Sequence, residues 1–269
     1  MTAASFLLRR DLILRSIVLM ALVAATASPL AHAQFRLTAG VKAWYTTWNI
    51  PVQQTPGIAM TDMTSALLAG PYLNFRLGKV AATVMYSTSL VKYQMTETSD
   101  GTQSVIASEG NLQLDRQDIN VFFNYSISPE VSLFANLKLL SYSNREALAT
   151  ITEQRFLYRR DYSGTGLGLG AQFTVPFSGE SPLYSFLSAG AYSNSSKRTS
   201  FTLSINEGAA TDVIGEADET GSELLYFLDA GLGMRIPASR LGATIGLRVE
   251  NGSVTKTAIG PTANLFYTF

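Results

Sequence analysis

Cysteine is absent from the 269-residue sequence. Disulfides, thiol catalysis, thiolate metal sites and a lipid attached to an N-terminal cysteine are therefore excluded. Because an oxidising compartment permits disulfides without requiring them, the absence does not identify the compartment.

Histidine is nearly absent as well, since the only one is His32, within the first 33 residues. Residues 34–269 therefore lack the side chain that titrates near neutral pH. A Ser–His nucleophile and a His-ligated metal are unavailable. Pairs of acidic residues remain as a possible acid and base, but no spacing singles one out. We expect no enzymatic activity, no bound metal and no cofactor.

The sequence also lacks an excess of charge of one sign and long apolar runs. Lys and Arg number 20, as do Asp and Glu, so the formal net charge is zero and favours no nucleic-acid partner. After residue 33 no apolar run approaches the roughly 20 residues of a transmembrane helix. A membrane can then be crossed only by a closed barrel, because unpaired backbone groups are not tolerated in hydrocarbon.

The start of the chain has the parts of a secretory signal peptide. Three arginines precede an apolar run over 17–27, and Ala31-His32-Ala33 follows as a small-residue cleavage site. We expect residues 1–33 to be a cleaved signal peptide and 34–269 to form one exported domain.

The remainder divides into about ten stretches in which apolar and polar residues alternate with period two, the pattern of barrel strands. Most meet the roughly 9–11 residues that a tilted strand needs to cross a bilayer. Misreading one segment would give eight or twelve strands, and both counts stay open. The stretches are 35–48, 67–77, 80–93, 113–125, 131–139, 157–175, 183–194, 228–236, 241–250 and 263–269.

The connections between these stretches are unequal. Short links rich in Gly, Pro or Ser alternate with longer polar ones, the asymmetry of short periplasmic turns and long external loops. Both chain ends are then expected on the periplasmic side. The short links are 78–79, 126–130, 176–182 and 237–240, and the long ones are 49–64, 94–112, 141–156, 195–222 and 251–260.

The last strand carries the most specific signal. Leu265, Tyr267 and Phe269 share one face of it, and the chain ends on an aromatic residue. This pattern resembles the C-terminal strand of Gram-negative outer-membrane β-barrel proteins, which their assembly machinery reads. The resemblance implies an all-β, antiparallel transmembrane barrel in the outer membrane, with the barrel-assembly machinery, lipid and lipopolysaccharide as partners. A soluble barrel or sandwich would alternate too, but the signal peptide, terminal Phe and strand lengths favour the membrane.

Charged residues recur on the polar face of the strands, and we expect them to line the lumen. Ten strands enclose only a narrow space, so we expect no wide pore. The charges form either a salt-bridged plug or a thin passage that favours small anions. The candidates are Arg36, Lys42, Arg76, Asp118, Lys138, Asp229, Arg235, Arg248 and Glu250.

Ten strands also resemble the omptin proteases, but their Asp–His pair has no counterpart in residues 34–269. The sequence thus predicts a narrow porin-like conduit or a largely closed structural barrel. The alternative is a surface binding or adhesion barrel that acts through its long loops. Two stretches suit a surface ligand: the acidic 207–223, predicted to be a solvated loop, and the arginine-bearing 141–160.

Overall fold

The computed structural model describes residues 35–47, 58–61, 65–99, 112–144, 147–151, 154–178, 181–205, 212–236, 238–252 and 257–269. The predicted signal peptide lies outside them. Within the described ranges all regular structure is strand, and no helix there is long and apolar enough to span a bilayer. The strands are β1 Phe35–Thr46, β2 Ile58–Thr61, β3 Ala66–Leu77, β4 Val80–Val91, β5 Tyr93–Ser99, β6 Leu112–Ser126, β7 Val131–Asn144, β8 Ala147–Ile151, β9 Gln154–Pro176, β10 Leu183–Ile205, β11 Asp212–Ile236, β12 Leu241–Gly252 and β13 Ala258–Thr268.

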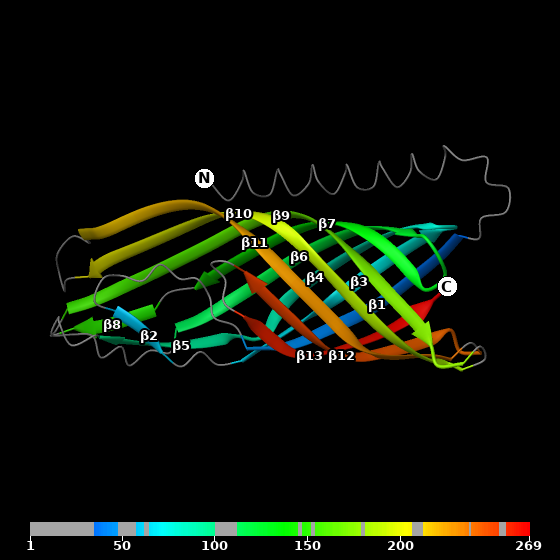
Figure 1. The fold of residues 1–269 in the computed structure, drawn as a ribbon. Coiled ribbons are helices and arrows are strands. Elements are labelled where there is room, and N and C mark those ends of the chain that lie inside the picture. Colours follow the sequence, from blue (N-terminus) through cyan, green and yellow to red (C-terminus); the bar gives the residue numbers. More distant parts are fainter. Residues whose placement is uncertain are drawn as a thin grey trace. The chain divides into compact units, whose positions relative to one another are not determined.

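Ten of these strands form a closed ring in which each pairs antiparallel with its neighbours (Figure 1). The ring runs β1–β3–β4–β6–β7–β9–β10–β11–β12–β13, and β13 closes it by pairing with β1. β2, β5 and β8 extend the hairpins beyond the ring. The prediction of ten antiparallel strands is confirmed, and the counts of eight and twelve are wrong.

Short turns join the strands at the end of the ring where β1 begins. Gly78 adopts a φ of 58°, which glycine reaches without steric cost, and so closes β3 onto β4 within two residues. Ser128 Oγ accepts hydrogen bonds from the backbone N–H groups of Glu130 and Val131, which stabilise the turn before β7. Phe269 N–H donates to the Leu37 carbonyl at 2.8 Å, so the last residue is tied to the first strand at this end.

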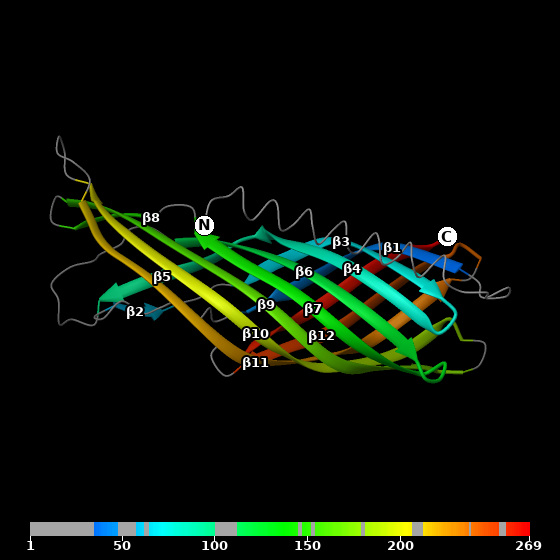
Figure 2. The same cartoon turned by 90° about the horizontal axis from the view of Figure 1, so that it is seen from above.

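Three strands are much longer than the rest. β9 and β10 have 23 residues and β11 has 25, whereas β1, β3, β4 and β12 have 12. The extra length continues past the ends of β12 and β13 (Figures 1 and 2). The predicted loops 141–156 and 195–222 are therefore largely wrong, since most of their residues are in strands, and 94–99 and 58–61 are strands as well.

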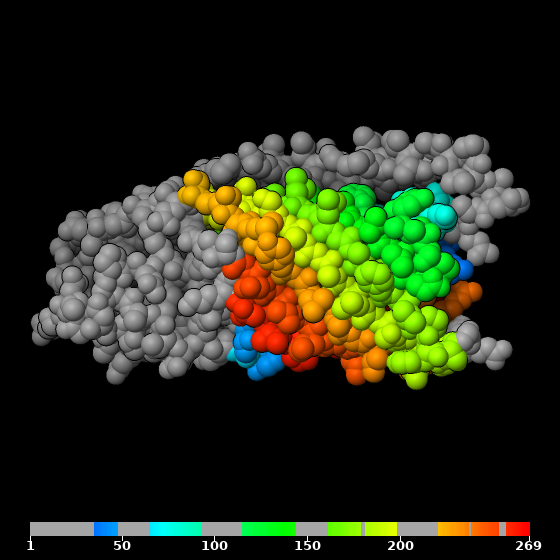
Figure 3. Space-filling view, viewed as in Figure 1, coloured from blue at the N-terminus to red at the C-terminus, as the bar shows by residue number. Residues whose placement is uncertain are grey.

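The outward side chains form an apolar belt around the ring. Leu169, Ile245 and Leu265 are 72, 66 and 62% exposed, as expected of side chains that face acyl tails. In the space-filling view the strands from β9 to β13 form an unbroken outer surface (Figure 3). An apolar outside and a charged inside identify the ring as a membrane barrel, and the predicted all-β, antiparallel transmembrane barrel is confirmed.

The belt ends part of the way along the long strands. Leu167, Ser193 and Leu224 lie at one level across β9, β10 and β11. At the next outward level the residues are Thr165, Ser195 and Ser222, all polar and exposed. On β9 and β11 the outward residue thus changes from leucine to a hydroxyl side chain, and on β10 serine is present at both levels. This change marks where the long strands leave the hydrocarbon.

Aromatic rings pack against glycines inside the barrel. A Cβ on Gly170 would come within 2.3 Å of the Phe134 ring, and one on Gly242 within 2.2 Å of the Phe266 ring. Phe134 in turn stacks on Phe227, with ring centroids 5.9 Å apart. The glycines therefore give the rings the space in which they fill the interior.

A Gly-Pro pair occurs in each strand that flanks β1. In β3 the register with β4 skips Gly70 and Pro71, between the pairs Ala69–Thr88 and Tyr72–Met85. In β13 the pairing with β1 likewise stops at Thr262 and resumes at Ile259, leaving out Gly260 and Pro261. Proline has no N–H to donate, so each pair interrupts a ladder of the ring.

Candidate functional site

Seven charged side chains form one connected network across the interior. Arg116 pairs with Asp118 at 2.6 Å, and Lys138 joins Asp118 at 3.7 Å to Glu250 at 3.0 Å. Arg248 continues the network, with 2.6 Å to Glu250 and 3.5 Å to Asp229. Lys42 ends it at 2.8 Å from Asp229. Four cations and three carboxylates are thus joined without a break.

Burial distinguishes this network from surface ion pairs. Arg116 is 0% exposed and Lys138 3%, and the three carboxylates are each 5% exposed. Pairs at such depth need close geometry and further hydrogen bonds to offset the loss of water. These are present, because Arg116 grips Asp118 through two nitrogens and Lys138 also donates to the Tyr192 hydroxyl at 3.0 Å.

Strand alternation explains how neighbouring members of the network meet. Arg116 and Asp118 are two residues apart on β6, and Arg248 and Glu250 are two apart on β12, so each pair shares the inward face. Lys138–Asp118 and Arg248–Asp229 each join two paired strands, β7 with β6 and β12 with β11. Two further links join strands that are not neighbours: Lys138 of β7 reaches Glu250 of β12, and Lys42 of β1 reaches Asp229 of β11. Only closure of the ring brings those strands face to face.

Trp44 is the aromatic centre of the network. The guanidinium carbons of Arg116 and Arg248 lie 5.2 and 5.4 Å from its ring centroid, within cation–π range. Arg248 also lies 4.7 Å from the Phe227 ring. The two arginines are therefore held by aromatic faces as well as by carboxylates.

A second polar cluster lies on the long strands beyond the network. Asn194 donates to the Tyr162 hydroxyl at 2.9 Å, and this hydroxyl donates to Glu223 at 3.3 Å. Glu223 is 6% exposed. The prediction that 207–223 is a solvated loop is therefore wrong at its end, since Asp212 onward is strand β11 and Glu223 points into the barrel.

The structure divides the nine predicted lumen residues into two groups. Lys42, Asp118, Lys138, Asp229, Arg248 and Glu250 belong to the network. The other three, Arg36, Arg76 and Arg235, are exposed toward the short turns. Arg76 there donates to the Gly78 carbonyl and the Ser126 hydroxyl, and Arg235 lies over the Tyr184 ring.

Arg116 is the member that the sequence reasoning missed. It precedes Asp118 by two residues and so shares its face, a signal that was available in the sequence.

The predicted assembly residues Leu265, Tyr267 and Phe269 face outward, and the ring centroids of the last two lie 4.9 Å apart. The side chains of the arginines in 141–160 lie outside the part of the chain that the structure describes.

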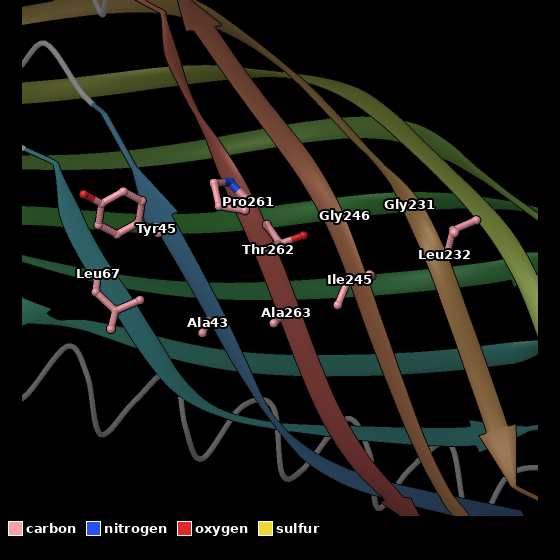
Figure 4. Close-up of a pocket in the computed structure, with 10 residues that line it drawn as sticks. All are labelled: Ala43, Tyr45, Leu67, Gly231, Leu232, Ile245, Gly246, Pro261, Thr262 and Ala263. Atoms are coloured by element: carbon pink, nitrogen blue, oxygen red, sulfur yellow. The ribbon is translucent and has the colours of Figure 1, made fainter.

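The outer wall carries a shallow apolar groove of about 560 Å³ across β3, β1, β13, β12 and β11. Figure 4 shows Tyr45 and Leu67 on one side of it, Leu232 on the other, and Ala43 and Ala263 between them. Small side chains leave this hollow within the lipid belt. Among the described side chains no three His, Cys, Asp or Glu residues converge to hold a metal ion.

No family model and no curated protein matches the sequence. Among solved structures, the translocator domain of autotransporter NalP from Neisseria meningitidis is 9% identical, with a TM-score of 0.46 over 99% of both chains. The outer membrane protease OmpT from Escherichia coli is 10% identical, with a TM-score of 0.44 over 88% of this chain and 96% of its own. A major outer membrane protein from Thermus thermophilus is 8% identical, with a TM-score of 0.42 over 87% of this chain and 99% of its own. None of these activities follows for this protein at such identities.

Proposed function

We propose that this protein is a closed structural barrel of the outer membrane, without enzymatic activity, and that solutes do not pass through its lumen. The observation that supports this is the buried network, whose seven charged members lie across the interior on five of the ten strands. A permeating ion needs a hydrated path or substitute ligands along its whole route. The cavity of about 20 Å³ among the network side chains has room for about one water molecule.

A narrow anion-selective conduit is the competing function, and conductance in planar lipid bilayers separates the two. We expect the purified wild-type barrel to give no unitary current steps. A Lys138→Ala/Glu250→Ala variant removes two large opposed side chains together and is expected to open a path. Arg235→Ala, at the exposed turn end, is the matched control and should stay silent. Unitary steps from the wild type would overturn the closed barrel.

A surface binding barrel is the second candidate, and it rests on the length of β9, β10 and β11. These strands continue well beyond the apolar belt, with β8 added at the edge of β9. A four-stranded sheet that leaves the membrane offers a platform for a surface ligand, which the short strands do not.

The position of this sheet is testable because the chain has no native cysteine. Single variants Ser204→Cys, in the extension of β10, and Ser239→Cys, in a short turn, are exposed to a membrane-impermeant maleimide on intact cells. We expect labelling at position 204 and none at 239, with both labelled after lysis. Labelling of 239 alone would place the extension on the periplasmic side and end the surface-binding proposal.

A further inference from the structure

The outer part of β11 is the edge of a sheet. From Leu225 to Ile236 the strand pairs with β10 on one side and with β12 on the other. Over 215–224 it pairs, among the described residues, with β10 alone and without a shift of register. It is therefore a border strand of the extension (Figures 1 and 2). Such an edge presents backbone N–H and C=O groups with which a further strand can pair.

β12 does not continue along this edge. It ends at Gly252, and the Thr257 hydroxyl donates to the side chain of Asn251 at 3.3 Å, so the chain has turned back by residue 257. β13 then runs between β12 and β1. Within the part of the chain that the structure describes, no strand takes the place beside 215–224 that β12 takes beside the rest of β11.

The alternation of the strand determines which backbone groups face this edge. Arg235 N–H donates to the Pro182 carbonyl at 2.8 Å, so Arg235 directs its backbone groups toward β10. Successive residues of an antiparallel strand direct these groups to opposite sides. Since the register with β10 does not shift down to residue 215, the even-numbered residues face the edge. They are Glu216, Asp218, Thr220, Ser222 and Leu224, and none is proline, so each supplies a donor and an acceptor.

The sequence of the edge indicates the charge of a partner strand. Residues 215–222 contain three acidic residues and neither lysine nor arginine. Glu219 lies opposite Arg198 of β10, whereas Glu216 and Asp218 lie opposite Phe201 and Thr199. Opposite charges on paired strands are stabilising and like charges are destabilising. A strand with Lys or Arg is therefore favoured on the free side, and pairing of this edge with that of a second copy is disfavoured.

The chain itself does not offer such a strand. Its longest stretches outside the described residues, after the predicted signal peptide, are 48–57 and 100–111. Neither contains lysine or arginine, and 48–57 contains two prolines. Proline removes a donor from a ladder and is unfavourable in a pairing strand. The basic strand is thus expected from another protein.

We propose that the outer edge of β11 binds an extended segment of another protein that carries lysine or arginine and adds to the sheet as a further strand. Main-chain hydrogen bonds with 216–224 hold the segment, and its cations lie opposite Glu216 and Asp218. The inference rests on the surface-binding candidate above and supplies the class of its partner. It is independent of whether the lumen conducts.

The first test is the binding of labelled peptides of about ten residues to the full barrel in an uncharged detergent, followed by fluorescence anisotropy at low salt. One peptide alternates lysine with threonine, a second has glutamate in place of lysine, and a third is the lysine peptide with N-methylated backbone amides. We expect the first to bind at least about tenfold more tightly than the others, because the site needs both charge and main-chain pairing. Equal binding of the lysine peptide and its N-methylated form would reduce the interaction to charge attraction and overturn the proposal, as would no binding of the lysine peptide.

A pair of variants places the peptide on this edge. Ser222→Pro removes one N–H that faces the edge and leaves the ladder with β10, since proline is tolerated in edge strands. Ser222→Ala is the matched control, because it keeps that N–H. We expect Ser222→Pro to bind the lysine peptide about fivefold more weakly, the effect of one lost hydrogen bond, and Ser222→Ala to bind it as the wild type does. Equal affinities of the two variants would overturn the site.

Hydrogen exchange of the wild type, followed by mass spectrometry, does not depend on a variant that folds. Adding the lysine peptide should slow exchange over 215–224 and leave 226–236 unchanged, because the latter already pairs with β12. No slowing over 215–224 would overturn the proposal. Labelling at position 204 tests separately whether the extension lies outside the cell. A labelled position 204 without peptide binding would end this inference and leave the surface-binding candidate intact.

Discussion

The short and the long strands of this barrel obey different constraints. β1, β3, β4 and β12 have 12 residues each, close to the roughly 9–11 that a crossing requires, so nearly every outward position in them faces lipid. β9, β10 and β11 have about twice that length, and at the first outward level beyond the belt they carry Thr165, Ser195 and Ser222. The crossing region is thus fixed by the bilayer, whereas the extensions are free to vary.

The largest effect is expected when a buried charge in the crossing region is removed. Lys138→Met removes one partner of both Glu250 and Asp118 inside the crossing region and should lower the free energy of unfolding by about 3–5 kcal/mol. Lys79→Met, in an exposed turn, should change it by less than about 0.5 kcal/mol. Urea titration in detergent, followed by the gel mobility of unheated samples, measures both. Equal losses would mean that the network does not stabilise the fold.

An arginine scan sharpens the contrast on the outer face. Ile245→Arg, at the middle of β12 and 66% exposed to lipid, should destabilise the barrel by about 2–4 kcal/mol. Ser195→Arg, outward on β10 but beyond the belt, should have almost no effect, because its environment is water. Folding titrations into lipid vesicles report the difference. If Ser195→Arg were as costly as Ile245→Arg, the belt would extend further up the long strands than we infer.

Two glycines, one in the crossing region and one in an extension, allow the same comparison for packing. Gly170→Ala brings a methyl group to 2.3 Å from the Phe134 ring and the Ala189 carbonyl, so we expect a loss of about 1–3 kcal/mol. At Gly221, on the outer part of β11, the nearest atom to a new Cβ is Ser196 Oγ at 3.6 Å, an ordinary contact. Gly221→Ala should be nearly neutral in the same denaturation assay, and a large loss there would contradict independent packing of the extensions.

The smallest effect is expected from shortening the long strands. Arg198 and Glu219 are cross-strand partners, so residues 199–218 can be replaced by a two-residue Asn-Gly turn without a change of register. We expect a folded barrel whose unfolding midpoint matches that of the wild type, because the crossing region keeps all its contacts. Failure of this variant to insert would show that the extension is required for folding.

Sequence alternation predicted the crossing strands well because the lipid imposes it. The turns at Gly78 and at 237–240 followed from residues that favour turns, and the ten segments followed from period two. The extensions of β10 and β11 were predicted to be loops because the stretch between the two crossing strands is mostly polar and includes the acidic segment 207–223. Phe201, Leu203 and Ile205 nevertheless alternate with polar residues, a signal for a strand that was available in the sequence.

The network could be predicted only in part for a different reason. The face of Asp118, Lys138 and Glu250 follows from alternation, but the link from Lys138 to Glu250 joins β7 to β12, which lie far apart in the chain and do not pair. Such pairs depend on ring size and strand tilt, neither of which a single strand encodes. Trp44 shows the same limit, because its contact with two arginines arises only when β1, β6 and β12 face a common interior.

The two Gly-Pro pairs give the wall a mechanical pattern. They interrupt the backbone ladder on both flanks of the β1–β3 hairpin, while the ladder within the hairpin runs through twelve consecutive residue pairs. The hairpin is therefore a continuous unit bounded by two interrupted ladders. Side-chain links from Lys42 to Asp229 and from Asn74 to Thr83 supplement the main-chain hydrogen bonds near these ladders. We expect the ring to open along these two ladders before it opens among β9, β10 and β11.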